Sequence, residues 1–262
     1  MKDFSVIIKE RKKLYKTKEY PMNIKQIVQA AVNIKIIRRV CMIGFQMFLR
    51  IYQLLFLKRN IIQKYWAKFD DVEFYLVEDL YQMEDLLIEG RVIPIKFAEF
   101  LMHELAGDIS GYTIKLGGCV FIYIAKEYFE TSFGTFILAH EVGHILNHHY
   151  EKMLYDEYNG LNYEVVNGYE VVVYDFEAQA DAYALKVSGE KPFYSDENYE
   201  EFKRKLCEIT IRSVEQFEDM FGEDEELTAR KNEILDEKER EIVFSSLMKQ
   251  FDMRKKLLPK YL

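Results

Sequence analysis

His140, Glu141 and His144 form an HExxH motif inside a stretch with a helical apolar pattern. Four residues advance an α-helix by roughly 400°, so both imidazoles lie on one face, one turn apart. Two neutral imidazoles in this register can bind one Zn²⁺ ion at about 2.0–2.1 Å. Glu141 lies beside them and can take a proton from a water molecule that zinc acidifies to a pKa of about 7. The spacing therefore predicts a zinc site with Glu141 as its general base.

The alternative interpretation of the motif is two core histidines that hydrogen bonds satisfy. With 5 His among 262 residues, HExxH arises by chance in roughly one chain in a hundred of this composition. The uncharged flanks, FILA before and ILN after, favour a buried helix with a metal at its exposed edge. His148 and His149 continue the same segment and are expected at the surface.

A catalytic zinc site needs a third protein ligand and an open position. The HExxHxxGxxH pattern is absent, because Asn147 and Tyr150 occupy its glycine and third-histidine positions. Glu177 and Asp181 lie four residues apart, and so on one face, in an alanine-rich segment predicted to be helical. We expect Glu177 to bind the metal and Asp181 to hold a ligating imidazole through its other nitrogen. The alternative third ligands are Glu164, Glu170 and Asp175.

Short β-rich runs are expected beside this site. One run predicts a strand, and an exposed edge there could hold an extended peptide substrate with its carbonyl toward the zinc. The run consists of Cys119, Val120, Phe121, Ile122, Tyr123 and Ile124. Asn167–Gly168, between two β-rich runs within residues 163–174, predicts a hairpin that walls the cleft. Helices are predicted over residues 95–105, 131–149 and 175–185, and over most of the remaining chain.

Charge is divided unevenly along the chain. Residues 1–69 carry 16 Lys or Arg against 3 acidic residues, a balance of +13, so a total of -8 leaves -21 for the remainder. We therefore predict a basic helical N-terminal region over residues 1–69 and a catalytic domain over residues 70–262. No recognition motif accompanies the basic charge, so nucleic acid is not an expected partner.

The apolar residues 24–57 raise the question of a membrane. Arg50 lies inside their longest run, and arginine at a bilayer centre costs roughly 2.5–3.5 kcal/mol. Gln46 and Gln53 weaken a spanning helix further. Two alternatives stay open: peripheral contact of residues 24–57 with an anionic lipid surface, or a basic face docked on the acidic remainder.

The three cysteines indicate a reducing setting. Cys41, Cys119 and Cys207 are far apart and form no CxxC pair, so neither a disulfide framework nor a cysteine zinc cluster is expected. The N-terminus lacks the pattern of a secretory signal. We expect a cytoplasmic protein, with membrane association as the alternative.

Two segments of the chain resemble gluzincin metallopeptidases. GGCVFIYIAKEYFETSFGTFILAHEVGHILNHH is similar to the strand, loop and helix of ImmA/IrrE-type peptidases of phages and mobile elements. DFEAQADAYALKVSGEKP is similar to the HtpX and prenyl-protein (CAAX) peptidases, whose third ligand is the first glutamate of an ExxAD segment. The resemblance spans about residues 117–192. It implies a zinc ligand at Glu177 and a supporting role for Asp181.

These observations predict a mainly helical α+β fold. It comprises a zincin-like catalytic domain with a small sheet and an active-site helix, after a basic helical region. The expected function is zinc-dependent hydrolysis of peptide bonds in a protein or peptide substrate. One alternative is a non-catalytic regulatory or interaction protein that uses a gluzincin-like domain for binding. The other is a membrane-associated peptidase.

Overall fold

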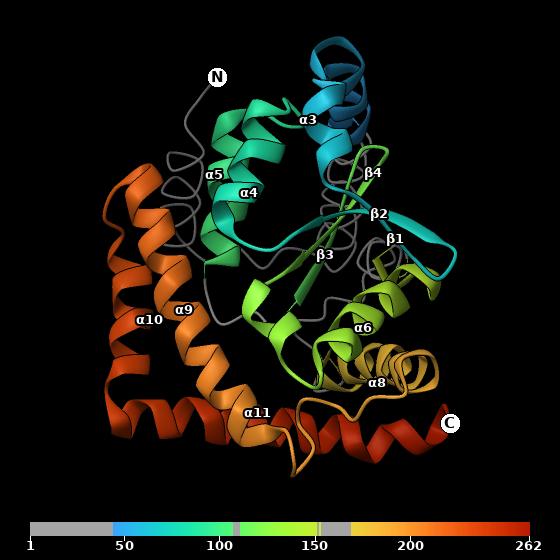
Figure 1. Ribbon diagram of the computed structural model, residues 1–262, viewed down its shortest axis with the longest axis vertical. Helices are drawn as coiled ribbons and strands as arrows, with labels where there is room; N and C mark the ends of the chain where they lie inside the picture. Colours follow the sequence, from blue (N-terminus) through green and yellow to red (C-terminus); the bar gives the residue numbers. More distant parts are fainter. Residues whose placement is uncertain (1–43, 107–110, 151, 153–168) are drawn as a thin grey trace, which may run out of the picture. The chain divides into compact units, whose positions relative to one another are not determined.

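The computed structural model describes the backbone of residues 44–106, 111–150, 152 and 169–262, and the side chains of the same residues except 169–174. These residues belong to one compact unit, Ile43–Leu262. Helices predominate around one small sheet (Figure 1). The prediction of a mainly helical α+β fold with a small sheet is therefore confirmed.

The sheet has four strands in the order β1-β2-β4-β3. They are β1 (Trp66–Phe69), β2 (Val72–Val77), β3 (Gly111–Leu116) and β4 (Cys119–Ile124). β1 and β2 are antiparallel, as are β3 and β4, whereas β2 and β4 are parallel. β1 and β2 lie on either side of the boundary that the charge pattern predicts between residues 69 and 70, and β1 falls where a helix was expected.

The predicted strand at residues 119–124 exists, but the prediction that it has an exposed edge is wrong. β4 is the inner strand here, because Phe121 pairs with Tyr75 of β2 on one side and with Ile114 of β3 on the other. Its continuous apolar sequence fits a strand buried on both faces, and such a sequence does not show which strand lies at the edge. Among the described strands, β3 is the edge nearest the helix that carries His140 and His144.

The core lies on both faces of the sheet. Phe121 and Tyr123 of β4 pack on one side, and Ile122 and Ile124 on the other, as alternation along a strand requires. The first side is covered by α3 (Arg59–Lys64), α4 (Leu80–Glu84), the π-helical turn η1 (Asp85–Glu89), α5 (Ile95–Leu105) and α10 (Glu225–Leu235). The second side is covered by α6 (Gly134–Leu146), α8 (Tyr169–Ser188) and α11 (Glu237–Leu257). α9 (Tyr199–Phe221) contributes to both sides.

α6 and α8 pack closely. A Cβ atom on Gly143 would lie 3.0 Å from the Cα and 3.1 Å from the carbonyl oxygen of Ala180. The alanines at 178, 180, 182 and 184 of α8 are all buried. Small residues on both helices thus let the two backbones approach, as the alanine-rich sequence predicts.

The hairpin predicted within residues 163–174 is wrong for its second run, the part that the structure describes. Residues 169–174, its second run, form the first turns of α8. Asn167–Gly168 and residues 163–166 lie outside the described part of the chain. Helix propagation gains one hydrogen bond per residue once a helix exists. Valine and tyrosine cost only up to about 0.7 kcal/mol each in a helix, so the alanine-rich helix extends through this β-rich sequence.

The helix contact predicts a stability effect at Gly143. We expect Gly143→Ala to lower the free energy of unfolding by about 1–3 kcal/mol, because its methyl group meets backbone that cannot move alone. Urea unfolding followed by circular dichroism measures the change. Gly118→Ala is the matched control, since no atom lies within 4 Å of that Cβ. Equal stability of the two variants would contradict the close approach of α6 and α8.

Candidate metal centre

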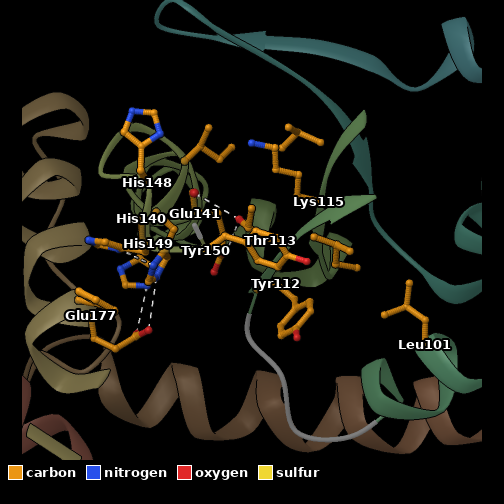
Figure 2. A pocket seen from close by; sticks show the side chains of 16 residues that line it. Leu101, Tyr112, Thr113, Lys115, His140, Glu141, His148, His149, Tyr150 and Glu177 are labelled. Carbon is orange, nitrogen blue, oxygen red and sulfur yellow. Dashed lines mark hydrogen bonds and ion pairs between the residues drawn. The ribbon is translucent and has the colours of Figure 1, made fainter. Parts of the chain in front are cut away.

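Three side chains from two helices converge on one point. His140 and His144 project from α6 with their Nε2 atoms 2.9 Å apart. Glu177 projects from α8, with Oε2 3.3 Å from His140 Nε2 and Oε1 3.3 Å from His144 Nε2. Figure 2 shows this carboxylate directed toward the ring of His140. The α6–α8 contact therefore brings together residues that lie more than thirty positions apart in the sequence.

The three residues fit a metal ion. Each offers one ligand atom, and these atoms all lie within 4.8 Å of one another. Tetrahedral zinc with bonds of about 2.0–2.1 Å would separate its ligand atoms by roughly 3.3 Å. The observed separations of 2.9 and 3.3 Å need only a small outward adjustment. Two imidazoles and a carboxylate also suit other transition metals, so this donor set defines a metal site without fixing the ion.

Asp181 orients the first histidine. Its Oδ1 lies 2.8 Å from His140 Nδ1, and the side chain is fully buried. A carboxylate accepts hydrogen bonds, so Nδ1 carries a proton and Nε2 is the nitrogen left to bind a metal. Tyr194 donates its hydroxyl to Asp181 Oδ2 at 2.5 Å. This arrangement is the one that the i,i+4 spacing of Glu177 and Asp181 predicts.

Arg254 of α11 joins the two carboxylates. Its Nε and Nη2 donate to Asp181 at 3.0 and 2.6 Å, and its Nη1 lies 3.1 Å from Glu177 Oε2. The guanidinium carbon lies 5.2–5.8 Å from the ring centres of Phe193, Tyr194 and Phe251. Sequence reasoning missed this residue. No local pattern marks it, because it lies 73 positions beyond Asp181.

The charged side chains at the centre carry a net negative charge, which favours a bound cation. Glu141, Glu177 and Asp181 contribute three negative charges and Arg254 one positive charge, which leaves -2 when both histidines are neutral. A divalent ion would neutralise this balance. In the structure without an ion, burial opposes a charge on His140. The hydrogen bonds and charges of Asp181 and Glu177 nevertheless outweigh burial and raise its pKa to about 9.

The second histidine is oriented by a different chain of hydrogen bonds. His144 Nδ1 lies 2.9 Å from His149 Nδ1, and His149 Nε2 lies 3.3 Å from Gln179 Oε1. Since the amide oxygen accepts, His149 Nε2 donates to it and His149 Nδ1 accepts from His144. His144 Nε2 is then free to bind a metal. Gln179 is held in turn by Asp175 and Tyr261, at 3.3 and 3.5 Å.

The expectation that His149 lies at the surface is wrong. α6 ends at Leu146, and His148 then adopts a positive φ of 54°. This left-handed residue turns the chain back, so His149 is 2% exposed and stacks on Phe176 with ring centres 4.5 Å apart. Burial, followed by the nearby charge of His144, lowers the pKa of His149 to about 4 and keeps the ring neutral. His148 itself is exposed, as expected.

The Glu141 side chain is held by a residue of the sheet rather than by a residue of α8. Thr113 of β3 donates its hydroxyl to Glu141 Oε2 at 2.7 Å (Figure 2). Gly111, at the start of β3, leaves room for the other oxygen, because a Cβ there would lie 2.8 Å from Oε1. Neither residue carries a recognisable sequence signal, since both depend on the order of strands in the sheet.

A cavity of about 640 Å³ opens at the centre. Its wall includes His140, Glu141, His144 and Glu177, together with residues 111–115 of β3. Of the predicted substrate strand, only Val120 lines it. A second, smaller cavity of about 150 Å³ adjoins three of these residues, His140, Glu141 and Glu177, and is otherwise mostly apolar. The centre is thus reached by a larger cavity along β3 and by a smaller one beside α11.

Of the alternative third ligands, Asp175 is engaged elsewhere in the described structure. The Asp175 carboxylate is occupied by Lys260, at 2.9 Å, and by the Tyr261 hydroxyl. The side chains of Glu164 and Glu170 lie outside the described part of the structure. Glu177 is therefore the acidic residue that the described structure places with the two histidines.

Comparison with known proteins identifies no relative. No family model matches the chain, and no curated protein or solved structure matches it. The functional inference therefore depends on the geometry of the site.

The hydrogen bond from His144 to His149 predicts an effect on metal affinity. His149→Phe preserves stacking on Phe176 but removes the acceptor, so we expect about 10–100-fold weaker zinc binding. Competition with a chromophoric chelator measures this affinity. His148→Ala is the control, because that exposed side chain makes no described contact with His144. Wild-type affinity in His149→Phe would show that the bond does not orient the ligand.

Proposed function

We propose that the chain is a zinc-dependent metallopeptidase of the HExxH gluzincin type. The observation that carries the proposal is the convergence of His140, His144 and Glu177 beside Glu141 at the wall of one cavity. His140, His144 and Glu177 would hold the metal through two nitrogens and one carboxylate oxygen. Bound zinc would polarise the scissile carbonyl and acidify the attacking water.

Glu141 is the general base in this proposal. Thr113 occupies its Oε2, which leaves Oε1 to accept a proton from the attacking water and to pass it to the leaving amine. Asp181 and His149 keep the Nδ1 protons of the two ligating imidazoles in place, so the metal-facing nitrogens stay unprotonated. The buried aromatic side chains around Arg254 make the surroundings of its guanidinium largely apolar.

A peptide is the substrate that the sheet favours. Among the strands that the structure describes, β3 lies at an edge of the sheet, and Gly111, Thr113 and Lys115 line the cavity beside Glu141. An extended peptide can add to such an edge through main-chain hydrogen bonds, with its side chains alternating toward and away from the cavity. We therefore propose that the substrate pairs with β3 rather than with β4, because β4 is already paired with a strand on each side.

The variant Glu141→Gln distinguishes a catalytic peptidase from a protein that only binds its partner. We expect hydrolysis of a quenched fluorescent peptide library by the zinc-loaded protein to fall by about 10²–10⁴-fold, because the amide cannot accept the proton. Zinc content and thermal midpoint should match those of the wild type. Glu233→Gln is the control, since Glu233 is exposed on α10. Zinc-loaded wild type that cleaves no peptide would favour the alternative of a non-catalytic binding protein.

Gly111→Ala tests how Glu141 is positioned. The added methyl group would lie 2.8 Å from Glu141 Oε1 and 3.1 Å from Ile137 Cγ2, so the flexible carboxylate must move. Misplacement of a reacting group by about 1 Å can cost about 10²-fold in rate, so we expect kcat to fall by tenfold or more. Zinc affinity should not change. Gly118→Ala, in the turn after β3, should leave kcat at the wild-type value. An unchanged kcat in Gly111→Ala would contradict the assigned position of Glu141.

A further inference from the structure

The helix over residues 44–56 is attached to the protein by a side that carries two glutamines together with Phe45 and Leu49. Gln46 Oε1 accepts from the backbone N–H of Gly117 at 3.0 Å, and Gln53 Nε2 donates to the carbonyl of Leu116 at 3.1 Å. Leu49, between these glutamines on the helix face, is fully buried. The two glutamines that interrupt the apolar sequence therefore point at the turn between β3 and β4.

The opposite side of this helix is apolar and exposed. Its large apolar side chains there are between 53% and 79% exposed, and they are Met47, Phe48, Ile51, Leu54 and Leu55. At about 100° per residue, these five positions cover an arc of roughly 120°. A surface helix normally exposes polar residues on its outward face, so an apolar outward face is unusual. The exposed face is therefore suited to contact with an apolar phase.

Positively charged side chains lie next to this apolar face. Arg50 lies at its border and Arg59 follows the helix. Both are exposed, and neither has an acidic partner among the described residues. Lys58 is also exposed and reaches Glu89 at 3.4 Å. Between Glu19 and Asp70 the sequence has nine Lys or Arg and no acidic residue, although the whole chain carries -8. The local charge is thus opposite to that of the protein as a whole.

We propose that the helix over residues 44–56 lies in the surface of an anionic lipid membrane. Its apolar arc would enter the boundary between headgroups and acyl chains, while Arg50 and Arg59 would contact the phosphates. The contact is peripheral: in the described part of the chain, no helix is long and apolar enough to cross a bilayer. The proposal does not depend on the metal centre, since none of these residues lines it.

A second copy of the chain fits this face less well. A two-fold contact through the helix would bring the basic borders of both copies together. Residues 43–64 contain no acidic residue to pair with them, so like charges would face each other. Phosphate groups of a lipid surface supply the negative charge that the segment itself lacks.

Vesicle flotation tests the proposal. The full chain is mixed with phosphatidylcholine vesicles that contain either no anionic lipid or about 30% phosphatidylglycerol. We expect binding to the anionic vesicles to be at least about tenfold stronger and to weaken as salt rises. Ile51→Glu/Leu54→Glu should lower this binding by about tenfold or more, and Arg50→Glu/Arg59→Glu should remove most of the preference for anionic lipid.

Ile242→Glu is the matched control, because Ile242 of α11 is 70% exposed and lies outside this face. It should bind vesicles as the wild type does, and circular dichroism should show the same helix content in all variants. Absence of binding to anionic vesicles would overturn the proposal, as would equal binding by Ile51→Glu/Leu54→Glu. A lipid-free dimer that the same double variant dissociates would also overturn it, and would assign the face to a second copy.

Discussion

Buried charge is the constraint on which the site depends. Asp181 is inaccessible to solvent, and an unpaired buried carboxylate costs several kcal/mol. Arg254 offsets part of that cost by contacting both Asp181 and Glu177, and its own burial requires α11 to pack on α8. However, the single positive charge of this guanidinium does not balance the three negative charges of Glu141, Glu177 and Asp181. The negative charge that remains where α6, α8 and α11 meet therefore suits a bound cation, as the proposed function requires.

Different elements of the fold support the two proposed tasks of the site, which are metal binding and proton transfer. α8 supports the two histidines of the candidate metal site, through Asp181 for His140 and through Gln179, by way of His149, for His144. β3 holds Glu141, the proposed general base, through Thr113. Because Glu141 shares α6 with both histidines, the base and the metal keep a fixed separation along one helix. Metal affinity and proton transfer should therefore respond to different substitutions.

The sequence predicts the parts of the site that depend on helical periodicity. The HExxH spacing puts His140 and His144 on one face, and Glu177 and Asp181 share a face for the same reason. What it does not predict depends on tertiary structure. Arg254 comes from a distant helix, and His149 is buried because His148 takes a positive φ. The strand order makes β3 rather than β4 the edge, and helix propagation overrides the β-rich sequence at the start of α8.

Metal content of the purified chain tests the central claim most directly. Inductively coupled plasma mass spectrometry should find about one zinc ion per wild-type chain after zinc is supplied and excess is removed. His140→Ala and Glu177→Ala should each lose most of this metal, whereas Glu233→Ala, on an exposed side chain, should retain it. Absence of bound metal in the wild type would contradict the account, and so would full retention by both ligand variants.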